Sequence, residues 1–115
     1  MIDIAVDDHG ELIVISIKGE FYIESIQYAE SVWEEQVVKH PRVIGINCQN
    51  IKFIDSSAIG ILVKFLNNAM AMNIELVFFD LSNTLINVFK TARLGNFFKV
   101  MEKEDFEKEY LKNNS

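Results

Sequence analysis

The sequence is poor in several residue types that small domains use for structure or chemistry. It has one cysteine and one proline among 115 residues. The single cysteine, Cys48, excludes an intrachain disulfide and any metal site made of several cysteines. With two arginines and a net charge of -6, the chain lacks the basic surface that binds phosphate backbones, so we expect no direct contact with nucleic acid.

Long apolar runs and a basic amino-terminal segment are missing as well. No stretch approaches the roughly 18 apolar residues that a membrane helix needs. The first residues, MIDIAVDDHGE, carry acidic side chains and lack the basic region of a secretory signal. We therefore expect a cytoplasmic protein that does not insert into a membrane.

The residues that enzymes use most are scarce. The two histidines, His9 and His40, fall in a turn and just before Pro41, and neither has a nucleophile and an orienting group arranged around it in the sequence. No glycine-rich phosphate-binding loop is present, and the acidic pairs are typical of solvated faces. We expect no enzyme activity, no catalytic residue, no metal and no cofactor.

What the chain does have is apolar residues in regular patterns. Half of its residues are hydrophobic, which is enough for one packed domain over residues 1–115, with 112–115 as a frayed tail. Alternation and β-branched residues predict an antiparallel hairpin of two strands at 2–6 and 12–17. A buried strand is predicted at 43–48, a fourth strand at 74–79 and a short edge strand at 97–101. A loop is expected over 49–55.

Helical spacing of apolar residues predicts the remaining elements, at 24–39, 56–71, 81–91 and 104–112. In the second helix the predicted apolar stripe is Ile59, Leu62, Val63, Leu66 and Met70. Trp33 is expected in the core, and the pairs Phe78-Phe79 and Phe97-Phe98 are expected in the core or as cover for the sheet. The order predicts an α/β fold with a mixed four- to five-stranded sheet, antiparallel in its amino-terminal hairpin and otherwise largely parallel, with about four helices.

One segment, NIKFIDSSAIG at 50–60, stands apart from these patterns. Asp55 lies where the segment gives way to a helix, and Ser56 and Ser57 fall in the first helical turn. A carboxylate there accepts hydrogen bonds from the free N–H groups at the positive end of the helix dipole. From the residues alone, this is either an ordinary helix cap or a functional site.

The stretch IKFIDSSAIGILVKF resembles the signature of STAS-domain anti-sigma-factor antagonists. In that signature an apolar pair, Asp, Ser, a phosphorylated Ser, a small residue and an apolar–Gly pair lead into a helix. The likeness extends over nearly the whole chain and includes Gly19 with Phe21 two positions on, VIGINC before the signature and IELVFF after it. The resemblance implies a single STAS-like domain and favours a functional site over a cap.

By position, Ser57 resembles the phosphorylated residue of the family, and Asp55 the acidic residue that begins the helix. The partner-binding residues that the resemblance and their placement suggest are Asp55, Ser56, Ser57, Ala58, Lys52, Glu20, Tyr22 and Glu24. The chain departs from the family where Ala58 replaces a common Gly, where Arg93 precedes Leu94 in place of a common Gly, and where Tyr22 replaces a common Asp. The last change removes a charge from the candidate recognition surface.

The resemblance implies a phosphoprotein that regulates transcription in a bacterium. The unphosphorylated domain, a monomer or weak dimer, would bind an anti-sigma factor that is also a serine kinase and so free a sigma factor. Phosphorylation of Ser57 would release that partner, and a serine phosphatase would reset the cycle. Two alternatives stay open: a STAS interaction subunit of another regulatory, stress-sensing or transport complex, and a small hydrolase or transferase with Ser57 as its nucleophile, although no general base is evident.

Overall fold

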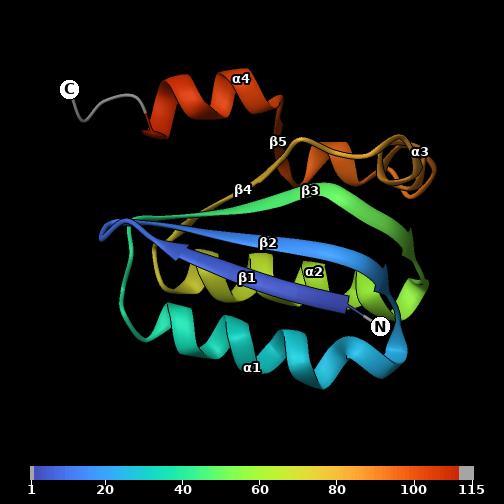
Figure 1. The fold of residues 1–115 in the computed structure, drawn as a ribbon, viewed down its shortest axis with the longest axis horizontal. Coiled ribbons are helices and arrows are strands. Elements are labelled where there is room, and N and C mark those ends of the chain that lie inside the picture. Colours follow the sequence, from blue (N-terminus) through green and yellow to red (C-terminus); the bar gives the residue numbers. More distant parts are fainter. Residues whose placement is uncertain (1, 112–115) are drawn as a thin grey trace.

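Residues 2–111, which this computed structural model describes, contain five strands that form one mixed sheet (Figure 1). The strands lie in the order β1-β2-β3-β4-β5 and span Ile2–Asp8, Leu12–Phe21, Val43–Ile54, Glu75–Phe79 and Lys99–Met101. β1 pairs with β2 in antiparallel fashion, and the other neighbours are parallel. The predicted fold class is confirmed. The tail at 112–115, expected to fray, lies outside the described residues.

Helices cover both faces of this sheet. They are α1 (Ile26–Val37), which a 3-10 turn precedes, α2 (Ser56–Ala71), α3 (Asn83–Thr91) and the short α4 (Lys103–Phe106), which continues as a π-helical turn over Glu107–Leu111. α1 and α2 lie side by side on one face, and α4 lies on the opposite face (Figure 1). All four begin within a few residues of the predicted positions.

The core is divided by the sheet into two clusters. The larger cluster joins α1, α2 and α3 to the strand residues on their side, among them Ile44, Ile46, Leu76 and Phe78. On the other face, Phe106 of α4 stacks on Phe79 with ring centroids 3.8 Å apart and planes 5° from parallel. Gly45 lies beneath these two rings, and its missing side chain leaves the space that they fill.

β3 is longer than the sequence predicts. The prediction of a loop over 49–55 is wrong, because the strand continues to Ile54. It pairs with β2 along this extension, up to the last pair, Phe21 with Ile54. The register shifts between Ser16 and Lys18 and again at Gly19, which takes a positive φ of 107°. Such irregularities break the alternation of apolar and polar residues on which the prediction relied. As a consequence, β2 and β3 end side by side.

The buried face of α2 also differs from the predicted stripe, of which Leu62 alone is fully inside. The buried residues are Ala58, Ile61, Leu62, Phe65 and Ala69, whereas Met70 is 64% exposed. Two small alanines let the helix lie close to the sheet, and the Phe65 ring stacks on Trp33 at 4.5 Å. The predicted residues Ile59, Val63 and Leu66 lie at the margins of this face, where they are partly buried against the core.

The aromatic predictions hold for Trp33, Phe78, Phe79 and Phe98, all of which are buried. The prediction for Phe97 is wrong, because its side chain is 70% exposed. Phe97 and Phe98 follow the 3-10 turn Leu94–Asn96 and lead into the edge strand β5. Phe97 ends this turn in a helical backbone conformation, and the N–H groups of both residues donate to the carbonyl of Leu94. In this turn the Phe98 ring lies in the core and the Phe97 ring lies outside it.

Candidate functional site

The end of β3 and the start of α2 are joined by Asp55, which forms hydrogen bonds to three segments: its carbonyl begins the helical ladder by accepting from the N–H of Ile59 at 3.0 Å, and three more bonds hold its neighbours. Its Oδ1 accepts from the N–H of Ala58 at 2.9 Å, which caps α2. Its Oδ2 accepts from the N–H of Ile23 at 3.2 Å, in the turn before α1. Its own N–H donates to the carbonyl of Phe21 at 3.2 Å. One residue thus holds together the end of β2, the approach to α1 and the first turn of α2.

The two serines of the signature occupy the first turn of α2. Ser56 is exposed and Ser57 is half-buried. The first N–H groups of a helix lack partners within the helix and carry the positive end of its dipole, which favours negative charge. An anionic group on either hydroxyl would therefore lie at the surface in a setting that accepts charge.

Four other predicted residues lie at the same end of the sheet. Glu20 pairs in register with Phe53, beside Lys52, at the ends of β2 and β3. Tyr22 and Glu24 belong to the turn that follows. The charge of Glu24, then partial burial and the charge of Glu20, raise the pKa of the Tyr22 hydroxyl, so this edge of the site is acidic. The structure brings together residues that are more than 30 positions apart in the chain.

Ala58 was predicted to contact the partner together with Ser56 and Ser57, but the structure gives it a different position. Its side chain is completely buried in the larger core cluster, so it presents no surface to a partner. Its backbone N–H is the group that the carboxylate of Asp55 binds. Ala58 therefore supports the site from inside while the serines face outward.

Exposed and half-buried apolar side chains surround the site, and of these only Tyr22 was predicted. Ile23 is 66% exposed and Phe53 is 49% exposed. The Tyr22 ring meets Phe53 edge-on, with centroids 6.3 Å apart, and a hollow of about 240 Å³ connects Tyr22 to Tyr28. We call these four residues, Tyr22, Ile23, Tyr28 and Phe53, the patch. The sequence held a signal for Phe53, an apolar residue within the loop expected over 49–55, whereas Tyr28 falls within the helix predicted over 24–39.

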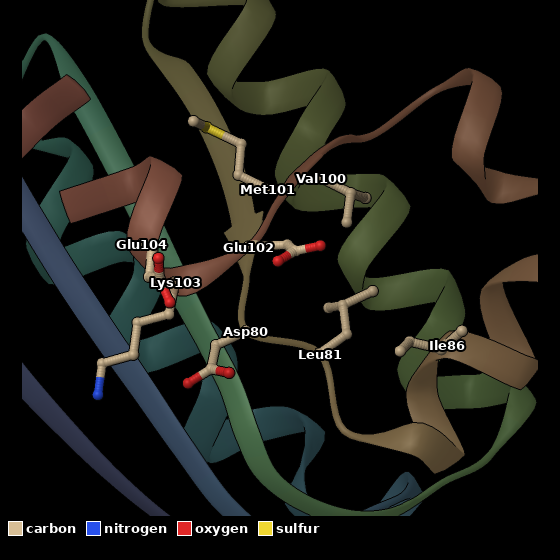
Figure 2. A pocket seen from close by; sticks show the side chains of 8 residues that line it. All are labelled: Asp80, Leu81, Ile86, Val100, Met101, Glu102, Lys103 and Glu104. Carbon is tan, nitrogen blue, oxygen red and sulfur yellow. The ribbon is translucent and has the colours of Figure 1, made fainter. Parts of the chain in front are cut away.

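A second hollow, of about 520 Å³, lies among β5, α3 and the start of α4 (Figure 2). Its apolar lining is Leu81, Ile86, Val100 and Met101, and its charged lining is the acidic Asp80, Glu102 and Glu104 with the basic Lys103. None of the eight predicted site residues, all of which the structure describes, lines this hollow. It is separate from the signature.

The cysteine thiol, possible metal ligands and the lengths of the helices can be described for residues 2–111. Cys48 is completely buried, and this burial, together with the charge of Asp80, raises the pKa of its thiol far above the ordinary value, so the thiol packs as an apolar group. In this part of the chain no group of three or more His, Cys, Asp or Glu side chains could hold a metal ion. No helix of the described range is long and apolar enough to cross a membrane.

Solved structures show the same fold. An anti-sigma factor antagonist from Mycobacterium paratuberculosis superposes with a TM-score of 0.84 at 17% identity, over 95% of this chain and 93% of that one. The Bacillus cell fate determinant SpoIIAA in its phosphorylated form gives 0.72 at 18% identity, over 93% and 98%. A sulfate transporter family protein from Wolinella succinogenes gives 0.66 at 17% identity, over 79% and 76%.

A search of curated proteins found no match to the sequence. The family model of the STAS domain, in contrast, matches residues 3–106. The matched range runs from β1 to the end of α4 and includes Asp55 and both serines of the signature. The chain belongs to the STAS domain family.

Proposed function

We propose that this chain is a phosphorylation-regulated anti-sigma-factor antagonist of the bacterial cytoplasm, which acts by binding and not by catalysis. Its unphosphorylated form binds an anti-sigma factor that is also a serine kinase, and so frees a sigma factor. Phosphorylation of Ser57 releases the partner, and a serine phosphatase restores the binding form.

The observation that carries this proposal is the position of Ser57. Its half-buried side chain lies in the first turn of a 16-residue helix, next to Asp55, whose carboxylate also binds the segment before α1. A phosphate on Ser57 would therefore meet the positive end of α2 and at the same time border the surface formed by Tyr22, Ile23 and Phe53. The modification can change binding while the fold remains intact.

The electrostatic effect of a phosphate is large enough for a switch. A phosphoserine carries about -1.5 to -2 charges at neutral pH. At about 5 Å from a partner's carboxylate, each pair of unit charges costs roughly 1–3 kcal/mol at a protein surface. Two such interactions weaken binding about 100-fold or more. No catalytic group of this chain is required, because the partner kinase supplies ATP and the chemistry.

The structural comparisons support a binding module of this class. The solved neighbours include an anti-sigma factor antagonist and a phosphorylated SpoIIAA, each similar to this chain over more than nine tenths of its length. Their identity to this chain, 17% and 18%, supports the shared fold, and the signature residues Asp55 to Ala58 carry the functional argument.

The direct test is phosphorylation in vitro. The purified chain is incubated with ATP and each serine-kinase anti-sigma factor encoded by the source organism, and phosphates are located by mass spectrometry. We expect one phosphate, on Ser57, that persists in Ser56→Ala and disappears in Ser57→Ala. A phosphate on Ser56, Thr84 or Thr91, or no phosphate with any kinase, would contradict the proposal.

A second candidate is a STAS interaction subunit of a transport complex. The similarity to a sulfate transporter family protein favours it, with a TM-score of 0.66 over 79% of this chain. In that role Ser57 need not be phosphorylated, and the partner is a membrane transporter. Affinity purification of the tagged chain from the source organism distinguishes the two, since it recovers an anti-sigma kinase in one case and a transporter in the other.

A further inference from the structure

We propose that Ile23 and Phe53 are the apolar anchors of the partner interface, and that the partner presents an apolar depression bordered by basic side chains. This inference rests on the proposed function, because it assigns the chemistry by which the anti-sigma partner recognises the surface around Ser57.

The exposure of these two side chains is unusual within their own segments. Phe21 and Ile51 stand two positions before Ile23 and Phe53, and they are 0% and 2% exposed. Ile23 and Phe53 are 66% and 49% exposed. The same residue types are thus buried where the fold needs them and presented to solvent beside Asp55. Apolar side chains that gather at one place on a surface mark interaction sites.

The backbone holds both anchors in place. The N–H of Ile23 donates to Asp55 Oδ2 at 3.2 Å, and Phe53 lies in β3 in register with Glu20 of β2. The Tyr22 ring supports Phe53 edge-on. Anchors that are already ordered lose little conformational freedom on binding, so most of the apolar area that they bury contributes to affinity.

The anchors adjoin the modification site through Asp55. The same carboxylate binds the N–H of Ile23 and the N–H of Ala58, the residue after Ser57. A partner that covers Ile23 therefore also covers the first turn of α2. A phosphate on Ser57 would have to lose its water at the edge of an apolar contact, and an unpaired charge is costly to bury there. This strengthens the switch beyond repulsion between charges.

The border of the patch decides which partner fits. The carboxylates of Glu24 and Glu20 lie on either side of Tyr22, and they outnumber the one basic side chain of the border, Lys52, which precedes Phe53. The chain carries a net charge of -6. A basic border on the partner complements these carboxylates and speeds association. A second copy of this chain would bring like charges together, so the charges favour a different protein with basic groups.

The test is a titration of the anti-sigma kinase that phosphorylates the chain, with matched pairs of variants. Ile23→Ser is paired with Val38→Ser, since these side chains are 66% and 67% exposed. Phe53→Ser is paired with Phe97→Ser, another exposed phenylalanine at 70%. We expect each anchor variant to lose affinity about 10- to 100-fold and each control to stay within about twofold. Glu24→Gln should slow association and weaken its salt dependence.

Circular dichroism and the fluorescence of Trp33 report whether each variant is folded, and Ile23→Thr and Phe53→Thr replace any serine variant that is not. If the wild type binds and both anchor variants bind equally well, the inference is overturned while the proposed function stands. An equal loss in the control variants also overturns it. If no kinase binds or phosphorylates the wild type, the proposed function fails first. A wild-type dimer that Ile23→Ser dissociates would instead assign the patch to a second copy of the chain.

Discussion

Asp55 and Ile23 are 32 positions apart in the sequence, yet the carboxylate of Asp55 accepts a hydrogen bond from the N–H of Ile23 at 3.2 Å. The other oxygen of that carboxylate caps α2. Asp55, a residue of the signature, therefore has two structural roles. One oxygen of its carboxylate caps the helix that carries Ser57, and the other fixes the segment that presents Ile23 and Tyr22.

Replacement of Asp55 by alanine should affect both segments. We expect Asp55→Ala to lower the free energy of unfolding by about 1–2 kcal/mol, because the cap is lost, and to speed hydrogen exchange at the Ile23 amide. Ser82→Ala is the control, since Ser82 caps α3 through the N–H of Leu85 at 3.3 Å. It should lower stability without a selective change at Ile23. Equal protection of the Ile23 amide in wild type and Asp55→Ala, measured by NMR, would show that the bond does not hold the segment.

Charge at Ser57 should weaken partner binding without unfolding the chain. Ser57→Asp adds one charge at the positive end of α2, so we expect stability to change by less than about 1 kcal/mol. Affinity for the anti-sigma partner should fall about 5- to 30-fold, or roughly 1–2 kcal/mol, because Asp carries less charge than a phosphate. Ser57→Ala should bind like the wild type and escape regulation. Titration calorimetry gives the affinities, and a well-folded Asp variant with unchanged affinity would reduce the signature to a helix cap.

Two glycines should respond in opposite directions to the same substitution. A Cβ at Gly45 would lie 2.7 Å from Cε1 of Phe106 and 3.2 Å from Cε1 of Phe79, so Gly45→Ala should destabilise the protein by about 1–3 kcal/mol through overpacking. A Cβ at Gly60 meets nothing within 4 Å, and Gly60→Ala should stabilise α2 by about 0.5–1 kcal/mol. Urea unfolding followed by Trp33 fluorescence measures both, and a tolerated Gly45→Ala would mean that Phe106 is not held over the sheet.

The ion pair between Lys99 and Glu75 should make stability depend on pH. The Lys99 ammonium, 2.7 Å away, lowers the pKa of Glu75 below its ordinary value of 4.5. The contribution is therefore present above that value and is lost as the pH falls through the lower pKa of the folded state. Because both side chains are more than 40% exposed, we expect Glu75→Gln to cost less than about 1 kcal/mol at pH ~7 and nothing at pH ~2.5.

Glu11→Gln is the control for that measurement. Glu11 and Arg42 approach only to 3.9 Å, with side chains 85% and 68% exposed, and such pairs contribute little. Urea titrations of both variants and the wild type at the two pH values provide the comparison. A loss in Glu75→Gln that is larger at the acidic pH would have the wrong sign and would refute the assignment.

Features that depend on neighbouring residues could be read from the sequence. The hairpin follows from two alternating strands and a short turn with Gly10, which takes a positive φ of 84°. The predicted bounds of α2, 56–71, are those of the structure, because a cap and a helical period are local signals. After the hairpin, strands and helices alternate along the chain, and a helix that connects two neighbouring strands makes them parallel, as the structure has them.

Only the tertiary structure decided what depends on contacts between distant segments. The extension of β3 to Ile54 needs β2 as its partner and a register irregularity at Gly19, neither of which leaves a periodic pattern in the sequence. The buried face of α2 includes two alanines, which a stripe of larger apolar residues left out. In the same way, the sequence alone predicted Asp55 and Ser57 as candidate site residues, while the side-by-side ends of β2 and β3 placed Ile23 and Phe53 around them. Burial is a property of the assembled fold, and so an exposed apolar side chain cannot be distinguished in the sequence from a buried one.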